Sequence, residues 1–227
     1  MPDDFKYLMV IESNLNPTAL SGSGAAGLWQ LMPGTAKEFG LEVDHSVDER
    51  YDAEKATVAA CRYLKQAYGR FGNWETVAAS YNGGQGRLAS QLDKQYADNA
   101  LDLLLVEETT RYVYRILAVK LLLSDPQKFG FRLRASDLYP PIPYRTLQVD
   151  STIEDLPRFA KGQGINYLLL RTMNPWLRSH SLPNHGKKTY TLRIPDREGM
   201  YYNPRVTIPH NKAWVTDGEQ TPSFINY

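Results

Sequence analysis

The sequence has little cysteine and little net charge, and it lacks long apolar runs. Cys61 is the only cysteine among 227 residues, so no disulfide can form within the chain. A chain of this length can bury an adequate core without one, and the apolar neighbours of Cys61 predict a small buried side chain. No segment approaches the roughly 20 consecutive apolar residues of a membrane span. The net charge of +1 gives no electrostatic argument for nucleic-acid binding.

Motifs for metals and cofactors are also missing. The sequence contains neither a Gly-x-Gly-x-x-Gly segment nor a phosphate-binding loop. Metal-ligand spacing with cysteines or carboxylates is absent around the four histidines, which are His45, His180, His185 and His210. We therefore predict no metal and no cofactor. The residues in excess are aromatic, with 15 Tyr and 4 Trp, and such rings suit the faces of sugars as well as protein cores.

The first half of the chain carries a helical pattern. Up to about residue 125, apolar residues recur at helical spacing between short glycine-rich turns. Four such stripes predict four helices, and their first apolar residues are Phe5, Ala56, Trp74 and Tyr112. Asp52 is a start signal for the second helix. These observations predict a mainly helical N-terminal domain, which we place at residues 1–130.

The pattern changes at about residue 130. Three prolines in the segment 131–143 predict a stiff linker. Beyond it, two strand-like runs enclose two helical runs, in the order Tyr144–Val149, Ile153–Ala160, Tyr167–Met173 and Tyr190–Ile194. This order predicts a small β-α-α-β module over residues 144–195. Residues 196–227 are polar with scattered aromatic residues, and we assign them to a C-terminal extension.

Glu12 is the residue whose position first suggests chemistry. It continues the apolar face of the first predicted helix and lies near the end of that helix. Burial and the negative end of the helix dipole both disfavour the carboxylate, so both raise the pKa of the Glu12 carboxyl. A raised pKa suits a general acid that works near neutral pH. The helix pattern alone is equally satisfied if Glu12 is only the last polar residue before a turn.

Four short motifs in a fixed order resolve this ambiguity. They are Glu12-Ser13, Gly27-Leu28-Trp29-Gln30, Ala79-Ser80-Tyr81-Asn82-Gly83-Gly84 and Glu108-Thr109-Thr110-Arg111-Tyr112. Together they resemble the catalytic core of the lytic transglycosylases with a lysozyme-like fold. The segments 47–52 and 59–64 are similar to those of the membrane-bound murein members of that family. Ser80 and Val106 depart from the family pattern, which more often has alanine and proline there, but neither change removes a group that the chemistry needs.

The resemblance implies an enzyme that cuts the glycan strands of bacterial peptidoglycan. Glu12 would be its single catalytic acid and base, without the second carboxylate that ordinary glycoside hydrolases use. Its product would be a 1,6-anhydromuramic end, formed when the C6 hydroxyl of the same sugar attacks C1. The resemblance assigns substrate-binding roles to seven further residues, which are Ser13, Ser21, Ser23, Gln30, Tyr81, Asn82 and Tyr112.

Several of these residues also have a plainer structural interpretation. Ser13 could satisfy its own helix backbone, and Ser23 could serve a turn. Asn82 could cap its helix. Tyr112 lies on an apolar stripe, so a core role alone would explain it, and we expect Trp29 in the core.

The β-α-α-β module resembles a LysM module, a class that binds glycans containing N-acetylglucosamine. Asp150-Ser151-Thr152-Ile153 stands where that family has Gly-Asp-Thr-Leu, and Ile194-Pro195 fits its closing strand. The usual glycine is missing and extra residues lie around 180–188, so the module could instead only brace the catalytic domain. The expected fold class is therefore a mainly α lysozyme-like catalytic domain with a small α+β LysM-like domain.

Partners and location follow from this resemblance. We expect peptidoglycan strands as partner, no nucleic acid, a monomer, and any membrane anchor outside this chain. The N-terminus lacks the basic and apolar segments of a signal peptide, so either the protein stays in the cytoplasm or the chain begins after its signal. Because peptidoglycan lies outside the cytoplasmic membrane, we expect the periplasm or the outer membrane.

Two other functions remain open at this point. A hydrolytic muramidase would use water as the acceptor and would need a second carboxylate. Candidates exist, but the simpler interpretation gives them surface or structural roles; they are Asp44, Asp48, Glu49 and Asp52. A non-catalytic peptidoglycan-binding protein is disfavoured, because the chain retains Glu12 together with the other motif residues.

Overall fold

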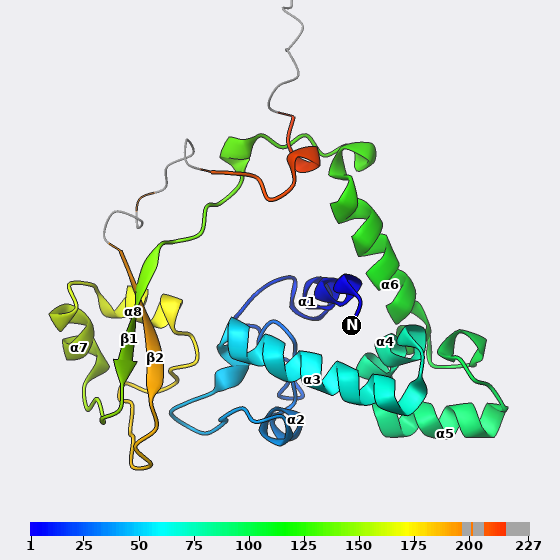
Figure 1. Ribbon diagram of the computed structural model, residues 1–227, viewed down its shortest axis with the longest axis horizontal. Coiled ribbons are helices and arrows are strands. Elements are labelled where there is room, and N and C mark those ends of the chain that lie inside the picture. Colours follow the sequence, from blue (N-terminus) through cyan, green and yellow to red (C-terminus); the bar gives the residue numbers. More distant parts are fainter. Residues whose placement is uncertain (197–200, 202–206, 217–227) are drawn as a thin grey trace, which may run out of the picture.

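The computed structural model describes residues 1–196, 201 and 207–216. These residues form a helical N-terminal body and, beside it, a small module with a two-stranded antiparallel sheet (Figure 1). The expected fold class, mainly α with a small α+β domain, is confirmed. Among the described residues, no helix combines the length and the apolar character that crossing a membrane requires.

The N-terminal body contains all four helices that the apolar stripes predict. A 3-10 helix, Asp3–Tyr7, leads into the first, and the six α-helices are α1 (Leu8–Ser13), α2 (Pro33–Glu38), α3 (Ala53–Phe71), α4 (Trp74–Gly83), α5 (Gln85–Gln95) and α6 (Glu107–Ser124). The stripes correspond to α1, α3, α4 and α6. Helix α5 was not predicted, because it buries a single side chain, Leu88. Asp52 caps α3 as expected, since its carboxylate accepts the backbone N–H groups of Glu54 and Lys55 at 3.0 Å.

Small side chains set the packing of this body. Helix α3 turns a row of alanines inward, and their size lets neighbouring helices approach closely. Trp29 is 2% exposed, and its indole N–H donates to Oγ1 of Thr57 on α3 at 2.8 Å. The core role expected of Trp29 is therefore confirmed. Cys61 is half-buried rather than buried, because it lies at the edge of the inward face of α3.

The C-terminal module follows the predicted β-α-α-β order. Strands β1 (Tyr144–Val149) and β2 (Tyr190–Pro195) pair antiparallel, with Tyr144 opposite Pro195 and Val149 opposite Tyr190. Between them lie α7 (Leu156–Gly162) and α8 (Tyr167–Met173). Helix α7 begins three residues later than the pattern predicts, because the Asp155 carboxylate accepts the N–H of Arg158 at 2.8 Å and caps the helix there.

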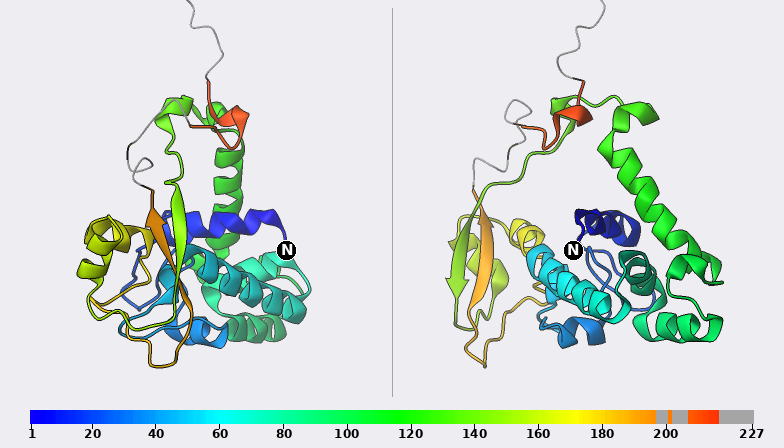
Figure 2. Two further views of the ribbon diagram at one scale, coloured as in Figure 1. Left: turned by 60° about the vertical axis from the view of Figure 1, so that its left-hand side comes forward. Right: turned by 45° about the vertical axis from the view of Figure 1, so that its right-hand side comes forward.

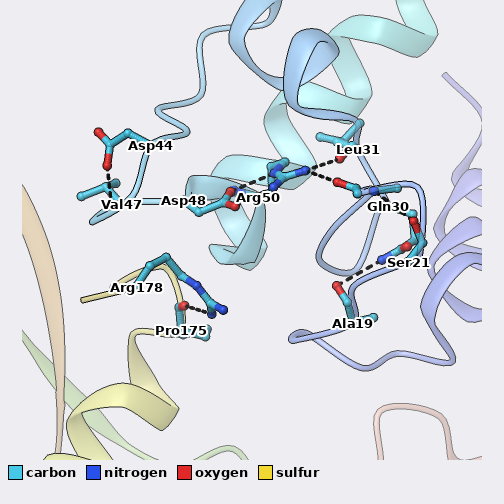
Figure 3. Close-up of polar contacts among 12 residues, drawn as sticks. Ala19, Ser21, Gln30, Leu31, Asp44, Val47, Asp48, Arg50, Pro175 and Arg178 are labelled. Carbon is cyan, nitrogen blue, oxygen red and sulfur yellow. Dashed lines mark hydrogen bonds and ion pairs between the residues drawn. The ribbon is translucent and has the colours of Figure 1, made fainter. Parts of the chain in front are cut away.

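The module and the helical body share one hydrophobic cluster. Val47 and Tyr51 of the body pack in it with Leu177 of the module. The backbone N–H of Asp48 donates to the carbonyl of Trp176 at 2.9 Å. Figure 3 shows Val47 and Asp48 of the body on one side of this contact and Pro175 and Arg178 of the module on the other. The module is therefore fixed against the segment that precedes α3.

A connection also runs across the top of the molecule in Figure 1 and Figure 2. The linker leaves α6 through a 3-10 helix, Pro126–Phe129, and reaches β1. The segment 207–216 lies against the start of this linker. There the Gln127 side chain donates to the carbonyl of Ala213 at 3.1 Å. The N–H of Thr216 donates to the carbonyl of Leu133 at 2.8 Å. Of the expected extension 196–227, residues 197–200, 202–206 and 217–227 lie outside the described residues.

A buried arginine anchors the loop between α1 and α2. The guanidinium of Arg50 pairs with Asp48 at 2.7 Å and donates to the carbonyls of Gly24 at 2.7 Å and Leu31 at 3.0 Å (Figure 3). Gly27 of the same loop lies against this segment with φ of +76°, and a Cβ there would stand 1.9 Å from the carbonyl oxygen of Arg50. Only glycine fits at that position.

We predict that Gly27→Ala destabilises the protein far more than the same change at nearby glycines. The strained φ and the clash together should cost roughly 2–4 kcal/mol. Gly24 has φ of +89° but open space around it, so Gly24→Ala should cost about 1 kcal/mol. Gly22→Ala meets nothing within 4 Å and should be close to neutral. Urea unfolding followed by circular dichroism measures all three, and equal costs at Gly24 and Gly27 would contradict the close approach.

Candidate active site

Glu12 and Tyr112 form the centre of the candidate site. Glu12 lies in the last turn of α1, and Tyr112 lies on α6 with 1% of its surface exposed. The hydroxyl of Tyr112 donates a hydrogen bond to Oε1 of Glu12. Two segments 100 residues apart in sequence therefore meet at one carboxyl group. Tyr112 is therefore buried, as its apolar stripe predicts, and its hydroxyl also reaches the candidate acid.

The surroundings of Glu12 favour its protonated form. Burial raises the pKa of the Glu12 carboxyl above its usual range, while the hydrogen bond from Tyr112 and the charge of Arg115 act to lower it. The negative charge of Glu108 acts in the raising direction. The Tyr112 hydroxyl stays protonated, because burial and the nearby Glu12 hold its pKa well above the ordinary tyrosine value. The pair can thus give a proton from the carboxyl and then stabilise the carboxylate that remains.

Tyr81 lies next to the candidate site and holds a neighbouring loop in place. Its hydroxyl donates to the backbone carbonyl of Trp29 at 2.7 Å, and its ring packs edge-on against Tyr63. Burial and the proximity of Glu12 raise the pKa of Tyr81 well above the ordinary tyrosine value, so this hydroxyl also stays protonated. Because the hydroxyl is committed to the Trp29 carbonyl, Tyr81 fixes the loop that carries Gln30.

Ser13 joins α1 to the same loop. Its side chain is 7% exposed, and its hydroxyl lies 2.8 Å from the carbonyl of Met9 and 3.0 Å from that of Leu28. The first contact is a hydrogen bond to the backbone of the same helix, which is the plainer interpretation of Ser13. The second contact ties the end of α1 to the loop, so Ser13 holds Glu12 in place through the backbone.

Ser21, Ser23 and Gln30 lie together on the loop between α1 and α2. The hydroxyls of Ser21 and Ser23 are 2.9 Å apart, and the Ser21 hydroxyl accepts the N–H of Ala25 at 3.0 Å. Gln30 has φ of +46°, and its amide nitrogen donates to the carbonyl of Gly27 at 2.9 Å. That bond orients the amide, and within residues 1–196, 201 and 207–216 its oxygen accepts no hydrogen bond. The oxygen is available to a sugar N–H or hydroxyl.

Asn82 links the end of α4 to the start of α6. Its side-chain oxygen accepts the hydroxyl of Thr109 at 2.9 Å, and its amide nitrogen donates to Glu108 at 3.4 Å. Asn82 lies inside α4, which continues to Gly83, so it is not a helix cap. The side chain instead fixes the first turn of α6 and thereby the direction from which Tyr112 approaches Glu12.

The other acidic candidates have structural roles. Asp48 pairs with Arg50, Glu49 accepts Lys55 and the N–H of Glu42, and Asp52 caps α3. Asp44 accepts the N–H groups of residues 46 and 47 at 2.7 and 2.8 Å. These carboxylates are therefore committed to the fold. In the described part of the chain, no group of three or more His, Cys, Asp or Glu side chains could hold a metal ion.

Sequence reasoning missed two charged groups near Glu12. Glu108 and Arg115 both act on the pKa of Glu12, and both lie on α6 with Tyr112. The signal was available, because residues at i, i+4 and i+7 share one side of a helix. Glu108 is part of the fourth motif without an assigned role, and Arg115 lies outside all four motifs.

Comparisons with known proteins agree with this geometry. Residues 1–103 match the transglycosylase SLT domain, and residues 145–198 match the LysM-like domain found at the C-terminus of soluble lytic transglycosylases. The segment that matches the SLT domain includes Glu12 and the loop around Gln30, and the LysM-like match covers the C-terminal module. Tyr112 lies just beyond the matched segment.

Individual relatives belong to the same class. The chain is 30% identical to membrane-bound lytic murein transglycosylase D of Escherichia coli K12, over 82% of this chain and 42% of the relative. It is 35% identical to the soluble lytic murein transglycosylase of the same organism, over 49% of this chain and 19% of the relative. The crystal structure of the 70 kDa soluble lytic transglycosylase of E. coli aligns over 52% of this chain and 21% of that chain, with a TM-score of 0.46. The chain thus spans less than half the length of these relatives.

We predict that Glu12→Gln stabilises the protein at neutral and higher pH. The pKa of Glu12 is raised by folding, so ionising it costs stability as the pH rises through that pKa, and protonation at low pH removes the cost. The variant should melt at a higher temperature than the native protein at pH 8, with the difference closing towards pH 4. Differential scanning calorimetry across this range measures it. Glu154→Gln, at an exposed position, is the control and should show no such trend; a flat difference for Glu12→Gln would contradict the burial.

Proposed function

We propose that the protein is a peptidoglycan lytic transglycosylase that cleaves the β-1,4 bond between N-acetylmuramic acid and N-acetylglucosamine. The observation that carries this proposal is the half-buried Glu12 carboxyl, with its raised pKa and its hydrogen bond from Tyr112. The SLT domain match over residues 1–103 and the lytic murein transglycosylases among its relatives support it. The expected product is a strand ending in 1,6-anhydromuramic acid.

In the first step, Glu12 acts as a general acid. Its proton passes to the glycosidic oxygen, the bond from C1 of muramic acid to that oxygen breaks, and N-acetylglucosamine leaves with a free hydroxyl. Burial supports this step because it keeps the proton on the carboxyl until the glycosidic oxygen takes it. The Tyr112 hydroxyl then stabilises the new carboxylate, since a hydrogen bond to a charged acceptor is stronger than one to a neutral acceptor.

In the second step, the same carboxylate acts as a base. The C6 hydroxyl of muramic acid attacks C1 and gives its proton to Glu12, which closes the anhydro ring and restores the acid. No water is consumed, so one carboxyl group serves both steps. The commitment of the nearby acidic side chains to caps and ion pairs supports a mechanism with a single carboxylate.

The neighbouring polar groups would position the sugar. We propose that Ser21 and Ser23 contact the N-acetyl group and that the free amide oxygen of Gln30 accepts a hydrogen bond from the glycan. Ser13, Tyr81 and Asn82 would act indirectly, because each is bonded to the loop or helix that carries a site residue. Preorganised groups of this kind supply much of the rate that one acid cannot.

The cell envelope is the proposed place of action. Peptidoglycan lies outside the cytoplasmic membrane, and the relatives include both membrane-bound and soluble lytic murein transglycosylases. We propose that the LysM-like module binds the glycan or braces the site through its shared core with the body. We also propose that the protein acts as a monomer and that any anchor lies outside this chain.

Digestion of purified peptidoglycan tests the proposed reaction. Mass spectrometry of the products should show 1,6-anhydromuropeptides from the native protein. Glu12→Gln should reduce their formation by roughly 10²–10⁴-fold or more while glycan binding persists, because the amide cannot donate the required proton. Products with reducing muramic ends would show hydrolysis instead, and full activity of Glu12→Gln would refute the role of Glu12.

Tyr112→Phe tests the hydrogen bond to Glu12. Removing a donor to a charged group should lower kcat by roughly 10–100-fold. The bond lowers the pKa of Glu12, so its loss should raise that pKa and move the alkaline fall of kcat/KM to higher pH. Tyr114→Phe is a matched control on the same helix, at a side chain that is 57% exposed. An unchanged pH profile for Tyr112→Phe would contradict the assigned role.

A further inference from the structure

A polar pocket lies on α6 beside the proposed catalytic pair. It has a volume of 430 Å³ and is lined by Glu107, Glu108, Arg111 and Arg115. Glu108 and Arg115 stand four residues before and three residues after Tyr112, so all three share one side of the helix. Two residues that line the pocket, Glu108 and Arg115, are therefore also the two charged groups that act on Glu12.

One charge in this pocket is uncommitted. Arg111 pairs with Glu107 at 2.9 Å, and Glu108 accepts the amide of Asn82 at 3.4 Å. In the part of the chain that the structure describes, the guanidinium of Arg115 has neither an ion pair nor a hydrogen bond. It is exposed, so a ligand can reach it without displacing a protein group.

The charges of the pocket are also separated along the helix. The two glutamates lie in the first turn of α6, and Arg115 lies about two turns further on, roughly 10 Å along the axis. Arg111 lies between them and neutralises Glu107. The end of the pocket at Arg115 is therefore positive, and Arg115 is near enough to Glu12 for its charge to lower the pKa of that carboxyl.

We propose that Arg115 binds a carboxylate of the peptide stem of peptidoglycan, which makes the enzyme selective for strands that carry acidic stems. This inference rests on the proposed function. The stem is attached to muramic acid, the sugar whose C1 reacts at Glu12, whereas N-acetylglucosamine carries no charge. A cation one turn beyond Tyr112 would therefore meet the stem and not the sugar chain. A guanidinium suits this role, since it can hold a carboxylate through two parallel hydrogen bonds.

The test compares two forms of one substrate. Soluble uncross-linked strands are used with free stem carboxylates and, in a second preparation, with those carboxylates converted to carboxamides. The native protein should cleave the acidic strands with a kcat/KM roughly tenfold higher, the lower range for a hydrogen bond to a charged group. Arg115→Gln should lose that preference, mainly through a higher KM for the acidic strands, while the loss of its charge beside Glu12 affects the cleavage of both substrates alike. Arg115→Lys should keep part of the preference.

Arg111→Gln is the matched control. It removes a cation from the same pocket, but that cation is already paired with Glu107. It should keep the preference for acidic strands. If Arg115→Gln slows both substrates equally, Arg115 has a structural or purely electrostatic role and the proposed recognition is wrong. Equal cleavage of both substrates by the native protein would also overturn the recognition alone. Absence of cleavage of either substrate would overturn the proposed function and this inference with it.

Discussion

The site depends on the backbone carbonyls of the loop from Gly24 to Leu31. Four of its carbonyls accept bonds from other parts of the body, with Ser13 on α1, Tyr81 on α4 and the buried guanidinium of Arg50 as donors. Buried carbonyls must find donors, and this loop finds them in side chains because it forms no regular secondary structure. Arg50 and Asp48 are both less than 10% exposed, so loss of either partner would leave a buried charge unpaired. The loop is thus held at several points, and Gln30 and Glu12 are held with it.

The C-terminal module takes part in the same framework. Trp176 accepts the N–H of Asp48, Leu177 packs with Val47, and the Arg178 guanidinium lies 4.2 Å from the centre of the Tyr51 ring. These contacts reach the segment that carries Arg50. The module for which the sequence left two roles open, sugar binding or bracing of the catalytic domain, therefore packs on the segment whose Arg50 holds the loop beside Glu12.

The candidate site works against stability at one point. Burial disfavours the carboxylate of Glu12, although the hydroxyl of Tyr112 donates a hydrogen bond to it. The same burial favours the protonated carboxyl, which is the form that the first step of the proposed chemistry needs. Two charges on α6 also act on the pKa of Glu12, which Arg115 lowers and Glu108 raises. The first three turns of α6 therefore bear on proton transfer and, by our proposal, on substrate choice.

The sequence by itself determined the elements and the centre of the site. Apolar spacing predicted α1, α3, α4 and α6, alternation predicted β1 and β2, and Glu12 stood out as a carboxyl on an apolar face. These features are local, so a single segment carries the whole signal. Helix α5 was not predicted because it buries only one side chain. The start of α7 was predicted three residues too early because Asp155 caps the helix. Only the tertiary structure decided that Tyr81 bonds to Trp29, that Arg115 lies beside Glu12, and that the module packs on residues 47–51. Each of these joins segments far apart in the chain, and no local pattern records which distant group will supply a partner.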